Sequence, residues 1–147
     1  MQVKDIMTPN PACCNDDTPL EKVARLMVEN DCGEIPIVDD ENSRRLVGVI
    51  TDRDIVCRTI ADGKNPLDFT AGDCMTTEVV AVTPTTALEE CCRLMEDKQI
   101  RRVPVVDETG GCVGIVALAD IAREGRKVTA GEVVKEVSAP SASSASA

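Results

Sequence analysis

The sequence has almost no aromatic side chains: Phe69 is alone among 147 residues, and Trp and Tyr are absent. The core must therefore be built from Val, Ile, Leu, Met, Ala and Cys. A planar ligand would have to lie between aliphatic side chains, because aromatic rings on which it could stack are nearly missing. His is also absent, which excludes a mixed Cys/His zinc site and the commonest general base of enzymes. An all-thiolate zinc site stays open.

Positive charge is scarce as well, and the formal net charge is −10. Nucleic-acid backbones and anionic membrane surfaces attract clustered Lys and Arg, so we expect neither as a partner. No apolar run approaches the ~20 residues of a membrane span, and the N-terminus lacks the apolar region of a signal peptide. These absences predict a cytoplasmic protein. Nucleophile elbows, Walker loops and Rossmann glycine fingerprints are missing too, so we do not expect an enzyme.

What the sequence does contain is an internal repeat. At an offset of 68 residues, DIMT (5–8) matches DCMT (73–76), TPLEKVARLM (18–27) matches TALEECCRLM (86–95), and EIPIVDD (34–40) matches RVPVVDE (102–108). The offset then falls to 66, so that LVGVITDRDI (46–55) matches CVGIVALADI (112–121). Self-similarity of this kind indicates two copies of one structural unit.

Each copy predicts the order strand–helix–strand–strand–helix. Apolar residues in 18–27 and 86–95 recur at i, i+3, i+4 and i+7, which is typical of an amphipathic helix. Both segments begin with Thr-x-x-Glu, which predicts capping boxes with Thr18 and Thr86 as N-caps. Second helices are expected from about Thr51 and Ala117. We predict an α/β (α+β) fold of two β-α-β-β-α repeats.

The predicted boundaries follow the repeat and the composition. We expect the first repeat at 1–60, a linker at 61–70, the second repeat at 71–126, a short C-terminal helix at 127–138 and a disordered Ser/Ala tail at 139–147. A unit of about 60 residues buries too little surface to be stable alone, so the two repeats should pack together.

These elements resemble the cystathionine β-synthase (CBS) domain family. The resemblance rests on DIMT opening each repeat, on x-Pro-hydrophobic-Val-Asp in a strand, and on Gly-h-h-Thr-x-x-Asp before the last helix, and it covers about residues 3–125. It is similar to a stand-alone bacterial tandem pair, or Bateman module, and implies packing with pseudo-two-fold symmetry. It also implies a regulatory homodimer that senses AMP, ADP, ATP, NAD or S-adenosylmethionine in the cleft between the repeats, requires no cofactor, and acts on an unidentified protein partner.

The resemblance further implies which residues contact the ligand. Asp54 and Asp120 would bind ribose hydroxyls, Thr51 phosphate or ribose, and Arg102 phosphate. The remaining candidates are Ile35, Pro36, Ile37, Val103, Pro104, Thr8 and Thr76, of which the strand residues would hold the adenine. The second repeat has Ala117 in place of Thr, and the first has Glu34 where the second has Arg102. We therefore expect at most one competent anion site.

The residues alone leave another interpretation of the junction open. Thr51 and Asp54 fit a Thr-x-x-Asp capping box at a helix start, and capping is compatible with ligand contact. Asp120 persists although its Thr partner is Ala117, which favours a role for the carboxylate beyond capping. Arg44 and Arg45 lie in a predicted hairpin loop and are expected to be surface charges.

The eight cysteines can be interpreted as core residues or as reactive thiols. All except Cys57 align with Ala, Val, Ile or Leu of the other repeat, so we predict that they are small buried hydrophobes and not metal ligands. A redox or metal sensor that uses the thiols nevertheless stays open. Separately, Ala117 in the second motif and Glu34 in the first repeat favour another alternative, a dimeric interaction scaffold that binds no ligand.

Overall fold

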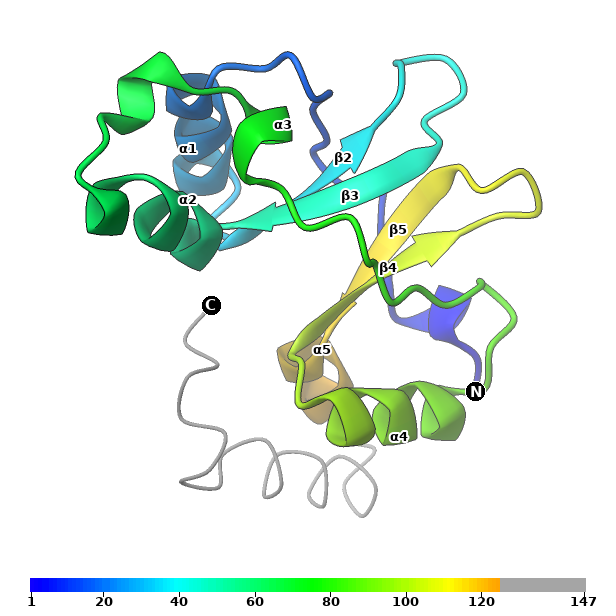
Figure 1. Ribbon diagram of the computed structural model, residues 1–147. Coiled ribbons are helices and arrows are strands. Elements are labelled where there is room, and N and C mark those ends of the chain that lie inside the picture. The colour runs from blue at the N-terminus through cyan, green and yellow to red at the C-terminus, as the bar shows by residue number, and fades with distance from the viewer. Residues whose placement is uncertain (125–147) are drawn as a thin grey trace. The chain divides into compact units, whose positions relative to one another are not determined.

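A computed structural model describes residues 1–124 (Figure 1). The helix expected at 127–138 and the tail expected at 139–147 lie outside the described residues. The elements are η1 (Val3–Asp5), β1 (Thr8–Pro9), α1 (Leu20–Glu29), β2 (Glu34–Val38), β3 (Leu46–Thr51), α2 (Asp52–Arg58), η2 (Ile60–Asp62), η3 (Pro66–Asp68), α3 (Ala71–Cys74), α4 (Leu88–Lys98), β4 (Arg102–Val106), β5 (Cys112–Ala117) and α5 (Leu118–Arg123). This mixture of helices and small sheets confirms the predicted fold class.

The described chain forms two compact units. The first unit contains residues 1–10, 80–108 and 113–124, and the second contains residues 11–79 and 109–112. Each unit therefore consists mainly of one repeat and also takes a short segment from the other. The boundaries expected from composition remain a prediction.

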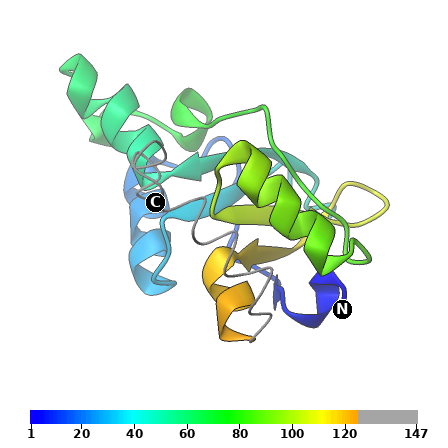
Figure 2. The ribbon, with the colours of Figure 1, turned by 90° about the horizontal axis from the view of Figure 1, so that it is seen from below.

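The first unit is built on a three-stranded sheet in the order β1–β5–β4. β1 pairs antiparallel with β5, so that Thr8 lies opposite Ile115. Apolar residues of α4 belong to the same core cluster as residues of β4 and β5. Figure 2 shows the α4 ribbon lying over the strands of this unit. The fully enclosed members of the cluster are Val3, Cys91, Met95, Val103, Val105, Val116 and Ile121.

The second unit has a two-stranded antiparallel sheet of β2 and β3. Its core cluster is Cys14, Leu20, Val23, Met27, Ile35, Ile37, Ile50, Ala71 and Cys74. Both clusters are aliphatic and sulfur-rich, as the near absence of aromatic residues predicts.

The extended segment before each long helix forms a single parallel bridge to a sheet strand. Cys14 bridges β2 and its amide donates to the Pro36 carbonyl at 3.2 Å, while Val82 bridges β4 and donates to the Pro104 carbonyl at 3.0 Å. The N–H and C=O of a strand residue point to the same side. The N–H that each proline lacks would therefore face this short bridge and not the long antiparallel partner, so the ladder is preserved.

The predicted N-caps of the two long helices are wrong. The Thr18 hydroxyl accepts a hydrogen bond from the Asn15 amide at 3.2 Å, and the Thr86 hydroxyl accepts one from the Thr83 amide at 3.0 Å. Each hydroxyl thus closes a turn that precedes its helix. The N-cap position falls on the next residue, which makes no side-chain cap.

Two glycines allow the DIMT-type segments to cross the sheets. A Cβ on Gly48 would lie 2.9 Å from the carbonyl oxygen of Thr76, and a Cβ on Gly114 would lie 3.1 Å from that of Thr8. Side chains at these positions would push the crossing backbone away. The repeats thus share this requirement for close approach.

We expect Gly48→Ala to destabilise the protein by about 1–3 kcal/mol, because its Cβ would overlap the Thr76 backbone. Thermal unfolding followed by circular dichroism measures the effect, since the chain has no Trp or Tyr for fluorescence. Gly33→Ala is the matched control: its Cβ would meet only the exposed Asp52 carboxylate at 3.0 Å, which can move aside. Equal melting temperatures for the two variants would contradict the expected overlap.

Candidate functional site

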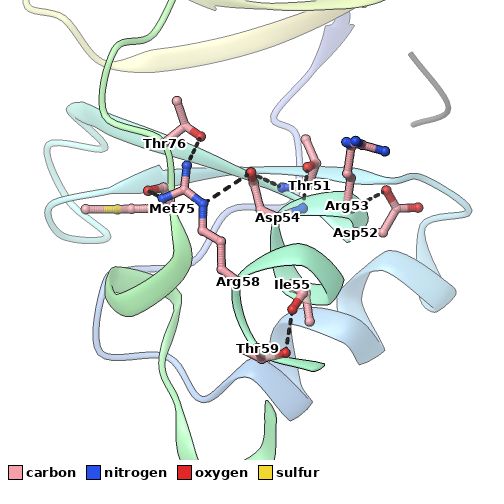
Figure 3. Close-up of polar contacts among 9 residues, drawn as sticks. All are labelled: Thr51, Asp52, Arg53, Asp54, Ile55, Arg58, Thr59, Met75 and Thr76. Carbon is pink, nitrogen blue, oxygen red and sulfur yellow. Dashed lines mark hydrogen bonds and ion pairs between the residues drawn. The ribbon is translucent and has the colours of Figure 1, made fainter. Parts of the chain in front are cut away.

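The junction between β3 and α2 is held by a reciprocal pair of hydrogen bonds (Figure 3). The Asp54 amide donates to the Thr51 hydroxyl at 3.0 Å, and the Thr51 amide donates to Oδ2 of Asp54 at 3.0 Å. The capping box predicted from Thr-x-x-Asp is therefore present. It fixes the Asp54 carboxylate at the start of α2 by one of its two oxygens.

Arg58 lies beside the other oxygen of that carboxylate. Its Nε is 3.8 Å from Oδ1 of Asp54, and the Asp54 side chain is 18% exposed. The guanidinium also donates to the Met75 carbonyl at 3.4 Å and to the Thr76 hydroxyl at 3.5 Å (Figure 3). One guanidinium thus connects the helix carboxylate with the DCMT segment.

Sequence reasoning missed Arg58. The available signal was its i,i+4 spacing from Asp54, which places both side chains on one face of α2. Its contact with Thr76 joins segments that are distant in sequence, so no local pattern reports it. Because the ion pair is long and Arg58 is half exposed, it contributes little stability.

The strands beneath this cluster bring two more predicted residues close. Thr76 and Val49 exchange two backbone hydrogen bonds, of 2.9 and 2.8 Å, and Pro36 lies opposite Val49 on β2. The neighbours Ile35 and Ile37 are 1% and 0% exposed and belong to the core. Side chains alternate along a strand, so Pro36 faces away from that core.

In the second repeat the same junction keeps half of its cap. The Ala117 amide donates to Oδ2 of Asp120 at 3.1 Å, but Ala117 has no hydroxyl to return a bond. Oδ1 of Asp120 accepts a hydrogen bond from Arg123, and the Asp120 side chain is 14% exposed. Both carboxylates therefore have one oxygen on a backbone amide and the other beside an arginine.

The other predicted residues of the first unit lie at or near the start of β4 and on β1. Arg102 is half-buried, and within residues 1–124 its guanidinium has no hydrogen bond or ion pair. The Leu118 amide donates to the Arg101 carbonyl at 2.8 Å, which brings the start of α5 beside this strand end. Val103 is a core residue, Pro104 is buried and Thr8 is exposed. Ligand contact by any of these residues stays a prediction.

The cysteines follow the repeat in part. Cys14, Cys74, Cys91, Cys92 and Cys112 are buried as expected, while Cys13 and Cys32 are half-buried and Cys57 is exposed. Burial raises the pKa of Cys91 to about 12 and that of Cys14 to about 11. Within residues 1–124, no group of three or more His, Cys, Asp or Glu side chains is arranged to hold a metal ion.

Of the two arginines expected at the surface, one is not there. Arg45 is exposed, but Arg44 is half-buried and its guanidinium makes three hydrogen bonds. Within residues 1–124, no helix has both the length and the apolar character needed to span a membrane.

Exchanging the cap residue between the repeats tests the junction. We expect Thr51→Ala to lower the free energy of unfolding by about 1 kcal/mol, and Ala117→Thr to raise it by about 0.5–1 kcal/mol. The first change removes the bond from the Asp54 amide, and the second supplies its counterpart at Asp120. Urea unfolding followed by circular dichroism measures both variants; a destabilised Ala117→Thr protein would contradict the equivalence of the two junctions.

Comparison with known proteins gives consistent matches along the chain. The family model "CBS domain" matches residues 3–58 and 71–127. Hypoxic response protein 1 of Mycobacterium tuberculosis is 37% identical over 139 residues, which cover 95% of each chain. A crystal structure of Hypoxic Response Protein I with two coordinated zinc ions has a TM-score of 0.75 and 39% identity, covering 84% of this chain and 98% of that one.

Two similar solved structures contain adenosyl ligands. The CBS domain pair of protein MJ0100, in complex with 5′-methylthioadenosine and S-adenosyl-L-methionine, has a TM-score of 0.73 and 30% identity and covers 84% of this chain and 94% of that one. CBSX2 in complex with AMP has a TM-score of 0.74 and 29% identity, with coverage of 86% and 97%.

Proposed function

The chain belongs to the CBS domain family, and from this premise we propose that it is a regulatory module that binds an adenine nucleotide or an adenosyl compound. Similar CBS pairs have been solved with AMP and with S-adenosylmethionine, which supports this class of ligand. Stand-alone CBS domain proteins are typically regulatory and not catalytic. Bound ligand would favour one conformational state, and a partner protein would respond to the shift in population.

The observation that carries the proposal is the state of the Asp54 carboxylate. Its Oδ2 is held by the Thr51 amide, whereas among residues 1–124 Oδ1 has only a long 3.8 Å contact with Arg58. A carboxylate has about four acceptor positions, so this group can still accept from the two adjacent hydroxyls of a ribose. Its partial exposure keeps that capacity accessible.

The groups around Asp54 suit the remainder of an adenosyl ligand. Arg58 and the Thr76 hydroxyl lie together on one side of the carboxylate. A guanidinium binds phosphate or carboxylate oxygens by charge-assisted hydrogen bonds, so Arg58 can serve the anionic end. We include Arg58 in the proposed site together with Thr51, Asp54 and Thr76.

The two repeats are not equivalent in this proposal. The second has Asp120 without a Thr, and its Arg123 bonds directly to that carboxylate. It also has Arg102, whose counterpart in the first repeat is Glu34. We propose that Asp54 gives the stronger ribose contact, with Asp120 and Arg102 as secondary candidates.

Isothermal titration calorimetry with AMP, ADP, ATP, NAD and S-adenosylmethionine tests the proposal. We expect at least one to bind, and Asp54→Ala to weaken it by roughly 10- to 100-fold, the equivalent of about 1.5–3 kcal/mol of charge-assisted hydrogen bonding. Asp52→Ala is the matched control, because it removes an exposed carboxylate from the same turn of α2 and leaves Thr51 and Asp54 in place. A millimolar titration with no heat for any of the five compounds would end the proposal.

A dimeric scaffold without a ligand is the second candidate. It is favoured by exposed apolar side chains of the second unit, since Val56 is 50% exposed and Ile60 58%. We propose a homodimer in either case, and light scattering measures it. A firm dimer whose melting temperature is unchanged by all five compounds would favour the scaffold.

We also propose a cytoplasmic location, as expected from the sequence. We do not propose a metal, in keeping with the expectation that the cysteines are buried hydrophobes and not ligands.

A further inference from the structure

Arg44 has an unusual conformation for a residue of a surface turn. Its φ of 52° lies in the left-handed region, which non-glycine residues adopt rarely. The guanidinium turns inward, where Nε donates to the Cys112 carbonyl at 3.3 Å and Nη2 to the Pro11 carbonyl at 3.1 Å. The Cys112 amide in turn donates to the Arg44 carbonyl at 2.7 Å. Arg44 thus fixes the start of β5 against the segment that contains Cys13.

The same guanidinium contacts a sulfur atom. Nη2 of Arg44 donates to Sγ of Cys13 at 3.2 Å, and the Cys112 thiol forms a hydrogen bond with the Cys13 side chain. The protonated Cys13 sulfur itself donates to the Pro11 carbonyl at 3.3 Å. All of these residues belong to the second unit. One guanidinium therefore contacts both cysteines, Cys13 at its sulfur and Cys112 at its carbonyl, and brings a fixed positive charge beside them.

This environment favours the thiolate form of Cys13. Its pKa is lowered from 9.0, first by the hydrogen bond from Cys112 and then by the Arg44 charge, against the opposing effects of burial and of the neighbouring Cys14. Burial raises the pKa of Cys14 to about 11. The pKa values of the adjacent Cys13 and Cys14 are therefore shifted in opposite directions. Cys13 is half-buried, whereas Cys14 is buried. Thiolates beside a cation are the reactive thiols of proteins.

We propose that Cys13 and Cys112 are a redox-responsive thiol pair, in which Cys13 reacts with small-molecule disulfides and Cys112 then closes an intramolecular disulfide. This activity is separate from adenosyl binding, because it uses neither Asp54 nor its neighbours. Cys112 is 1% exposed, so it can be reached by the Cys13 sulfur but not by a bulky oxidant in solution. The order of the two steps follows from this difference in exposure.

The reaction balances with a small disulfide as the oxidant. The Cys13 thiolate attacks one sulfur of that disulfide, forms a mixed disulfide and releases the other half, which takes up a proton as a thiol. Cys112 then loses its proton, its sulfur attacks Sγ of Cys13, and the second half leaves as a thiol. Two protein thiols are oxidised to one disulfide, and one small disulfide is reduced to two thiols.

Oxidation would join the two sequence repeats covalently, since residue 13 lies in the first and residue 112 in the second. It would also turn the sulfur that Arg44 contacts into a disulfide sulfur that cannot ionise. Arg44 would retain its two carbonyl acceptors, so the turn between β2 and β3 keeps its anchor in both states.

The test treats the fully reduced whole chain with oxidised glutathione at neutral pH and identifies modified cysteines by peptide mass spectrometry. We expect Cys13 to react at least about 5-fold faster than the exposed thiol of Cys57, and the product to contain a Cys13–Cys112 disulfide. In Cys112→Ser, the glutathione adduct should remain on Cys13. Faster reaction at Cys57, or a wild-type product without the Cys13–Cys112 bond, would overturn the proposal.

Variants of Arg44 separate activation from structure. Arg44→Gln should slow the reaction of Cys13 by about 5-fold or more and move the pH midpoint of its alkylation by iodoacetamide upward, while Cys57 is unaffected. Arg44→Lys keeps the charge and should keep most of the rate, and Arg45→Gln, at the exposed neighbour, should change nothing. If Arg44→Gln and Arg44→Lys slow Cys13 equally with an unshifted midpoint, Arg44 is a structural anchor only and the proposal fails.

Discussion

The backbone pairing of Thr76 with Val49 is the constraint on which the second unit depends. Two hydrogen bonds hold the DCMT segment against β3, and Gly48 permits the approach because any Cβ would occupy the space of the Thr76 carbonyl. The first unit meets the same constraint with Thr8 against β5. Without this pairing, Arg58 would have no hydroxyl to contact, and the carboxylate of α2 would face solvent without an adjoining strand.

Asp54 combines a structural and a proposed functional role through its two oxygens. One stabilises the first turn of α2, where the unpaired amides of a helix need acceptors. The other is left beside an arginine at a distance that gives little stability, so the fold loses little if a ligand hydroxyl takes that position. Asp120 repeats the arrangement with a direct Arg123 contact, which makes its second oxygen less accessible to a competitor.

Structural features that depend on residues close together in the sequence could be predicted from it. The capping box at Thr51 and the amphipathic helices follow from spacings of three and four, and the fold class follows from the repeat. The N-caps predicted at Thr18 and Thr86 are wrong because a Thr hydroxyl can also accept a hydrogen bond from an amide three residues before it. Thr18 accepts from Asn15 and Thr86 from Thr83, so each hydroxyl closes a turn before its helix. Arg58 and Arg44 could not be placed, since the first depends on Thr76 and the second on a left-handed turn and on Cys112, all brought together by tertiary structure.

The exchange of short segments between the two repeats has a consequence for how the chain folds during synthesis. Val3 is fully buried in the first unit, and Thr8 pairs with Ile115, a partner about a hundred residues later, a separation that slows folding. The opening residues therefore leave the ribosome long before β5 exists. Most of the second unit can form first, and the N-terminal segment must wait, with its apolar residues exposed, for the last strand to arrive.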